Sequence, residues 1–167
     1  MSGKTTFMRT VGINIILART GGFVCAGEMH VPILDVVTSM RLQDDLNEGV
    51  STFYAELKRI RMVINFAQAQ PNTIFLIDEI FRGTNSVDRL AGAMGVIAKL
   101  NSVNAIGLIS THDLELCELE NAHKRIVNYS FCEHYKNNEL LFDYKLKKGK
   151  SKTTNARYLM EMLGIVE

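Results

Sequence analysis

Two short apolar runs, each followed by polar residues, limit most strongly what this chain can fold into. Residues 73–77 read Thr-Ile-Phe-Leu-Ile, and residues 105–110 are likewise mainly apolar and include β-branched residues. Strands that are apolar on both faces are typical of parallel sheets, because helices cover both sides of such sheets. Between the runs, apolar residues from Leu90 to Leu100 recur at helical spacing, and a helix there can return the chain to a parallel neighbour. The pattern predicts a strand, helix, strand unit of an α/β fold.

Similar periodicities predict the remaining elements. Residues 5–18 and 52–70 carry apolar positions three and four residues apart, which is typical of amphipathic helices. Further along, the strand-like segments 126–132 and 140–146 are separated by a polar turn and predict an antiparallel hairpin. A last helix is expected over residues 155–163.

Length and charge narrow the class of protein further. The 167 residues are 47% hydrophobic and 22% charged, which predicts one globular domain over residues 1–167 that needs no disulfide or structural metal. A formal net charge of +1 indicates no overall attraction to nucleic acid or to an anionic membrane. Cys25, Cys117 and Cys132 form no C-x-x-C pair, and no apolar run is long enough to span a membrane. We therefore expect a cytoplasmic chain without a membrane segment.

The tripeptide Gly3-Lys4-Thr5 stands at the start of the first predicted helix. It matches the second half of the phosphate-binding pattern G-x-x-x-x-G-K-[ST]. In that pattern, backbone N–H groups cradle phosphate, the lysine pairs with the outer phosphates and the hydroxyl binds Mg²⁺. Alone, the tripeptide is weak evidence, because a chance match in a flexible terminus explains it equally well.

Polar residues also follow both apolar runs, at the ends where parallel strands present ligand sites. After the first run, Asp78 would hold Mg²⁺ through water, and Glu79 would orient and deprotonate an attacking water. Residues 110–113 follow the second run, and His112 among them is a candidate sensor of a γ-phosphate. The alternatives are a solvated turn for the two acids and an ordinary loop position for His112.

Ser51 immediately precedes the second predicted helix, so it is a natural N-cap. A helix N-terminus with a free hydroxyl is also a site for anions. Both interpretations remain open from the residues alone.

Taken together, these motifs resemble the ATPase domain of the MutS family, within the wider ABC ATPase class. The matching stretches are residues 2–9, 44–53, 75–84 and 110–113, and the resemblance extends over essentially the whole chain. It implies an ABC-type P-loop NTPase fold, with a mainly parallel sheet flanked by helices and a C-terminal antiparallel hairpin. The ligands it implies are ATP or ADP and Mg²⁺.

The resemblance also implies roles for single residues. Glu79 and His112 would be catalytic, and Thr5 with Asp78 would hold Mg²⁺. The residues that would bind the nucleotide within their own subunit are Ser2, Gly3, Lys4, Thr5 and Thr6.

A homodimer through the ATP sites is implied as well. Ser51 of one subunit would cap, in trans, the γ-phosphate held by the P-loop of the other subunit. Asp88 would lie in the dimer loop between the two sites. The alternative for Asp88 is the N-cap of the helix that follows.

The chain departs from the family pattern in several places. Residues 82–86 read Arg-Gly-Thr-Asn-Ser where mismatch-repair members tend to read RGTST, which indicates a divergent MutS-related protein. The first P-loop glycine and the strand before it would precede Met1, so we expect a chain truncated inside Walker A that lacks the first P-loop strand. Mismatched or branched DNA would be bound by regions outside this chain. The basic run over residues 145–152 is interpreted as a solvated surface.

The function these motifs favour is an ATP-binding and ATP-hydrolysing module of a DNA mismatch-repair-like MutS protein. It would be an Mg-dependent ATPase that couples ATP at composite dimer sites to DNA-binding segments outside this chain. One alternative is an ABC-class ATPase of another assembly, although no LSGGQ-like stretch is present. Another alternative is a nucleotide-dead dimerisation fragment.

Overall fold

A computed structural model describes residues 3–40, 52–81, 83–103, 105–136, 139–151, 160 and 164–165. The chain forms two compact units, one over Lys4–Ile126 and the other over Met1–Gly3 with Val127–Glu167. The expectation of one domain over residues 1–167 stays a prediction.

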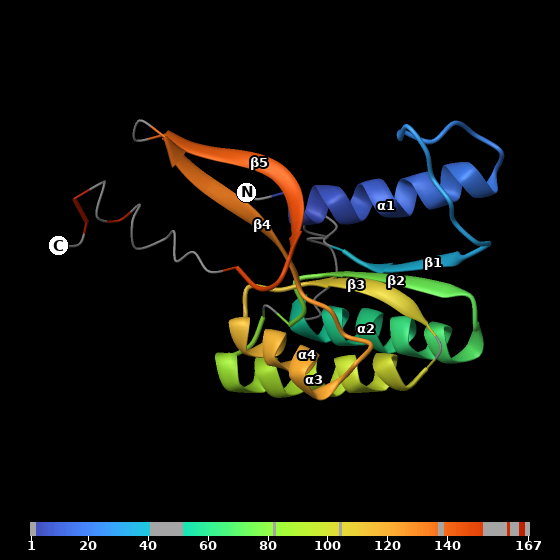
Figure 1. Cartoon of the computed structure of the whole chain (residues 1–167). Coiled ribbons are helices and arrows are strands. Elements are labelled where there is room, and N and C mark those ends of the chain that lie inside the picture. Colours follow the sequence, from blue (N-terminus) through green and yellow to red (C-terminus); the bar gives the residue numbers. More distant parts are fainter. Residues whose placement is uncertain are drawn as a thin grey trace. The chain divides into compact units, whose positions relative to one another are not determined.

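The larger unit is built on a parallel sheet of three strands (Figure 1). In spatial order these are β1 (Asp35–Ser39), β2 (Thr73–Asp78) and β3 (Ile106–Ser110). Residues 73–77 of the central strand are all buried, as expected for a strand covered on both faces. The two predicted parallel strands are therefore confirmed.

The sequence patterns do not predict β1. Its residues read Asp-Val-Val-Thr-Ser, so only two of five are apolar and no clear alternation marks a strand. The strand is stabilised by pairing with β2, with which it aligns in parallel from Asp35 opposite Thr73 to Ser39 opposite Ile77. The strand is formed by its neighbour rather than by its own propensity.

Helix α1 (Lys4–Arg19) covers one face of this sheet (Figure 1). Ile74 and Leu76 of β2 form a buried cluster with Met8 and Ile15 of α1. Alternate residues of a strand point to opposite faces, so this cluster uses every second residue of β2. The predicted helix over residues 5–18 is confirmed.

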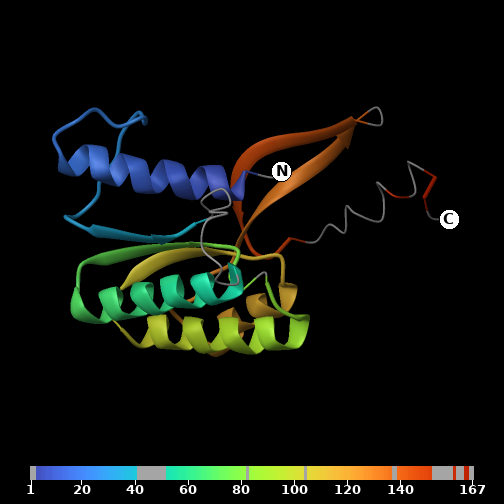
Figure 2. The ribbon, with the colours of Figure 1, turned by 180° about the vertical axis from the view of Figure 1, so that it is seen from behind.

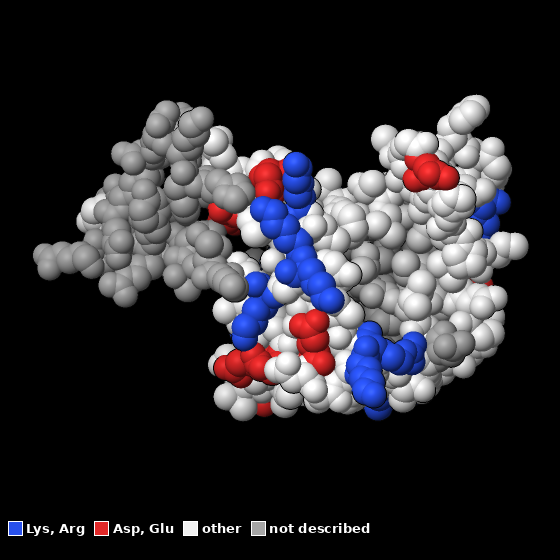
Figure 3. Space-filling view, viewed as in Figure 1, with Lys and Arg blue, Asp and Glu red and all other residues white. Residues whose placement is uncertain are grey.

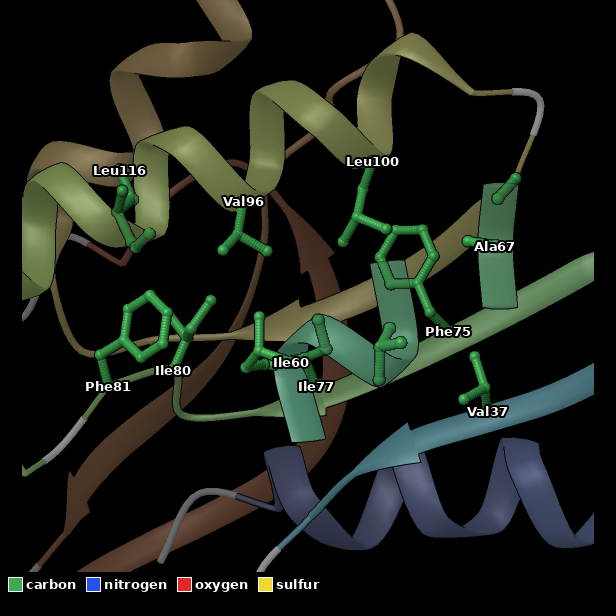
Figure 4. Packing of buried hydrophobic residues seen from close by; sticks show 13 residues of the cluster. Val37, Ile60, Ala67, Phe75, Ile77, Ile80, Phe81, Val96, Leu100 and Leu116 are labelled. Atoms are coloured by element: carbon green, nitrogen blue, oxygen red, sulfur yellow. The ribbon is translucent and has the colours of Figure 1, made fainter. Parts of the chain in front are cut away.

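Helices α2 (Thr52–Ala69) and α3 (Ser86–Ser102) cover the opposite face, as the reverse view shows (Figure 2). Phe75 and Ile77, the other alternating residues of β2, pack there with Val63 of α2 and with Val96 and Leu100 of α3. Figure 4 shows Phe75, Ile77, Val96 and Leu100 in this cluster. The two predicted helices are confirmed, and the unit is a helix, sheet, helix sandwich. The chain then continues through the 3-10 helix η1 (Leu114–Glu118) and the short α4 (Leu119–Ala122).

In the smaller unit, β4 (Tyr129–Lys136) and β5 (Glu139–Lys148) pair antiparallel. The predicted hairpin is confirmed, but its first strand begins at Tyr129 rather than at Ile126. Ile126 instead donates its backbone N–H to His123 in a turn. The helix expected over residues 155–163 lies outside the described residues, apart from Met160.

Charged side chains of both signs occur on the face drawn in Figure 3. Within β5, Lys147 forms an ion pair of 2.7 Å with Asp143, and this hydrogen bond raises the pKa of Lys147. Among the described residues, no helix is long and apolar enough to cross a membrane.

Gly107 of β3 leaves room for a side chain of the neighbouring strand. It pairs with Phe75 in the parallel register, and a Cβ built on it would lie 2.3 Å from the Phe75 ring. That separation is far below van der Waals contact, so only glycine leaves room for the ring.

We expect Gly107→Ala to lower the free energy of unfolding by about 1–3 kcal/mol, because the added Cβ displaces the packed Phe75 ring. Urea unfolding followed by circular dichroism measures the change. The matched control is Gly95→Ala in α3, where nothing lies within 4 Å of an added Cβ. Alanine is favoured over glycine within a helix by about 0.5–1 kcal/mol, so the control gains stability. An unchanged urea midpoint for Gly107→Ala would contradict this packing.

Candidate functional site

The candidate site lies at the edge of the sheet where β2 and β3 end. The parallel register places Asp78 opposite Ser110. The Ser110 hydroxyl donates a hydrogen bond to Oδ1 of Asp78. The backbone N–H of Glu79 donates to the Ser110 hydroxyl at 3.1 Å and to the Ser110 carbonyl at 3.1 Å. These contacts hold the two acids side by side on a buried serine.

The first residues of α1 meet the same edge of the sheet. The Thr5 hydroxyl donates a hydrogen bond of 2.8 Å to Oδ2 of Asp78, so this carboxylate accepts from two hydroxyl groups. Lys4 Nζ donates to the Thr111 carbonyl at 3.2 Å and lies 3.4 Å from Nδ1 of His112. The N-terminus of a helix carries unsatisfied N–H groups and a partial positive charge, which favour an anion. An ammonium group beside it adds a full positive charge.

Glu79 and His112 form a carboxylate–imidazole pair. His112 Nε2 and Glu79 Oε1 lie 2.7 Å apart. The Glu79 side chain is 14% exposed and the His112 side chain is 69% exposed. The imidazole therefore reaches solvent while the carboxylate it contacts stays largely covered.

The backbone at the end of β2 is in an uncommon conformation. Glu79 has φ of 55° and Phe81 has φ of 59°. Both angles lie in the left-handed region, which residues with a Cβ rarely occupy. Such positions persist only where neighbouring contacts hold them, and they occur preferentially at functional sites.

An ion pair fixes the loop that carries His112. Arg89 of α3 donates to both carboxylate oxygens of Asp113, from Nε at 2.8 Å and from Nη2 at 2.9 Å. The hydrogen bond to Asp113 raises the pKa of Arg89. The Asp113 N–H in turn donates to the Thr111 hydroxyl at 2.9 Å. Sequence reasoning did not pair Arg89 with Asp113, because nothing local links residues that meet only through the fold.

Asp88 is not the N-cap of α3, so the simpler interpretation of this residue is wrong. The cap is Asn85, whose side chain accepts from the backbone N–H of Asp88 at 2.9 Å. The Asp88 carboxylate accepts from the Asn85 amide at 2.6 Å. Asp88 sits in the first turn of the helix, where a negative charge complements the helix dipole.

The remaining predicted positions are less informative. Gly3 has φ of 95°, a conformation that favours glycine. Thr6 is exposed in the first turn of α1. Ser2 and Ser51 lie outside the described residues, and α2 begins at Thr52. The structure thus brings together Lys4, Thr5, Asp78, Glu79 and His112.

The donor set around Asp78 fits a small, hard cation. A hydroxyl and a carboxylate, from Thr5 and Asp78, supply oxygen atoms at one point. Mg²⁺ commonly takes one or two protein carboxylates and completes its shell with water and phosphate. In the described part of the chain, no cluster of three or more His, Cys, Asp or Glu residues is suited to hold a metal.

Comparison with known proteins gives one consistent family. The profile of the family described as MutS domain V matches residues 1–165. A DNA mismatch repair protein MutS of Prochlorococcus marinus is 34% identical over 98% of this chain and 18% of its own length. The proteins of that name from Streptococcus mutans and Methanosarcina mazei are 34% and 32% identical, over 99% and 100% of this chain and 19% of their own lengths. The chain therefore spans about a fifth of the length of these curated relatives.

We expect Ser110→Ala to lower the free energy of unfolding by about 1–3 kcal/mol, because it removes a buried hydroxyl that serves both acids. Chemical denaturation measures the loss. Ser102→Ala is the control, since this exposed hydroxyl donates to the Lys99 carbonyl near the end of α3. A surface change of this kind stays within about 0.5 kcal/mol of the parent. Equal losses for the two variants would contradict a special role for Ser110.

Proposed function

The chain belongs to the MutS family as a domain V, and from this premise we propose that it binds and hydrolyses ATP within a DNA mismatch-repair-like protein. One observation carries the proposal. A lysine, two adjacent acids, a threonine hydroxyl and a histidine from three separate segments meet at one edge of a parallel sheet. This is the edge where open α/β sheets bind their ligands.

An ABC-type P-loop NTPase fold is the architecture that best accommodates these residues. Lys4 and Thr5 stand at the start of α1, where backbone N–H groups and the helix dipole favour phosphate. The Lys4 ammonium lies beside the strand ends, within reach of the Thr111 carbonyl. In the proposed complex it pairs with the outer phosphates instead.

Thr5 and Asp78 are the residues that would hold Mg²⁺. When bound, the ion neutralises charge on the phosphates and orients them for in-line attack. The Asp78 carboxylate is already held by Ser110, so it needs little rearrangement to accept a cation.

Glu79 is the proposed general base. It accepts a proton from water as the water oxygen attacks the γ-phosphorus, and the bond from that phosphorus to the bridging oxygen of ADP breaks. Partial burial supports this role, because a largely covered carboxylate is held in one position. His112, 2.7 Å from Glu79, orients the carboxylate and donates a hydrogen bond towards the γ-phosphate.

The dimer and its DNA are further parts of the proposal. Ser51 of one subunit caps the γ-phosphate of the other, and Asp88, in the first turn of α3, lies between the two sites. The exposed position of Asp88 in the first turn of α3 is compatible with contact to a second subunit. Mismatched or branched DNA is bound by other regions of the protein, to which ATP turnover is coupled.

We expect Glu79→Gln to reduce ATP turnover by about 10²–10⁴-fold and to leave nucleotide affinity nearly unchanged, because the amide keeps the size but cannot take a proton. Phosphate release and a fluorescent-nucleotide titration measure the two quantities. Glu115→Gln, an exposed acid of η1, is the matched control and keeps parental turnover. A Glu79→Gln protein that hydrolyses ATP at the parental rate would exclude this residue as the base.

Mixing two inactive variants tests the composite site. Lys4→Ala damages the phosphate loop, and Ser51→Ala damages the capping hydroxyl. In a two-fold dimer each mixed pair regains one intact site, so equal mixing restores about a quarter of parental turnover. Activity that stays at the level of the separate variants would contradict capping in trans.

A further inference from the structure

The segment that follows the proposed base is bonded to α2. Glu56 of α2 accepts a hydrogen bond from the backbone N–H of Phe81 through Oε1. The donor belongs to a residue with φ of 59°, two positions after Glu79. A carboxylate that accepts from a backbone N–H makes a strong, charge-assisted bond.

The Phe81 ring is packed from two sides. It forms an edge-type contact with the ring of Phe53 in the first turn of α2, with centroids 6.1 Å apart and planes at 69°. On the side of α3, a Cβ at Gly92 would lie 2.9 Å from the ring, so the glycine leaves the space that Phe81 occupies. Phe81 is 5% exposed. The ring is therefore fixed against both helices of this face.

Glu56 and Phe53 lie three residues apart and so project from the same side of α2. Both contact Phe81: Glu56 accepts a hydrogen bond from its backbone N–H, and Phe53 packs against its ring. On the same side, a Cβ at Gly83 would lie 3.1 Å from Phe53, so the chain beyond Phe81 also runs close against α2.

We propose that Glu56 is a positioning residue: its hydrogen bond to Phe81 maintains the left-handed turn that carries Glu79 and so sets where that carboxylate stands. The inference rests on the proposed function, since it concerns the base of that reaction. Left-handed φ angles such as those of Glu79 and Phe81 are unfavourable for residues with a Cβ, so surrounding contacts must hold them. The Glu56 side chain of α2 provides one such contact, because it accepts a hydrogen bond from the Phe81 N–H. Because α2 begins immediately after Ser51, the same helix joins the proposed capping residue of the partner's site to the turn that carries the base.

The first measurement does not depend on ATP. Amide hydrogen exchange reports whether the Phe81 N–H is protected, and we expect Glu56→Ala to speed its exchange by about tenfold or more. Glu56→Gln keeps an oxygen acceptor of the same reach, so most of the protection remains. Gln68→Ala, an exposed change on the same helix, is the control and leaves exchange unaltered. Amides of Leu76 and Ile77 in β2 verify that each variant is folded.

The second measurement separates positioning from general stability. We expect Glu56→Ala to lower kcat for ATP by about tenfold with KM within about twofold, because a misplaced base affects the chemical step and not binding. Glu56→Gln restores most of kcat. Unchanged Phe81 exchange in Glu56→Ala, or faster exchange with kcat intact, would overturn the positioning role. A parental protein that does not turn over ATP would instead overturn the proposed function, and the exchange result would still decide whether Glu56 holds the turn.

Discussion

The hydroxyl of Ser110 joins the two acids of the candidate site, because β2 and β3 pair in parallel with Asp78 opposite Ser110. This buried hydroxyl donates to Asp78 through its O–H, and its oxygen accepts from the backbone N–H of Glu79. A shift of one residue between the strands would turn Ser110 to the other face and separate these groups. The register is secured by the core, since alternate residues of β2 pack against α1 on one side and against α2 and α3 on the other.

Each side chain of the site is supported by an element other than the one that carries it. Thr5 on α1 bonds to Asp78 on β2, and Arg89 on α3 binds Asp113 beyond β3. In the turn after β2, the backbone N–H of Phe81 donates a hydrogen bond to Glu56 on α2. Cross-support of this kind gives a site its geometry before any ligand arrives, which is what electrostatic catalysis requires.

Much of the fold was predictable because a strand that is buried on both faces requires a run of consecutive apolar residues. The run from Thr73 to Ile77 is typical of a covered strand, and the helical periodicities around it indicated the flanking layers. The short β1 was missed, since two valines among polar residues become a strand only when β2 is there to pair with. The position of Asp88 also allows an N-cap as the alternative interpretation, yet Asn85, three residues earlier, makes the capping contact.

The sequence by itself determined which chemistry is present: a Gly-Lys-Thr at a helix start and acids and a histidine after apolar runs. These signals are local, so residue type and spacing suffice to reveal them. The tertiary structure decided which of these groups lie in contact. It alone revealed that Arg89 forms an ion pair with Asp113 and that Glu56 accepts a hydrogen bond from the backbone of Phe81. Those partners are far apart along the chain, and their meeting depends on how helices pack on a sheet, which no short pattern encodes.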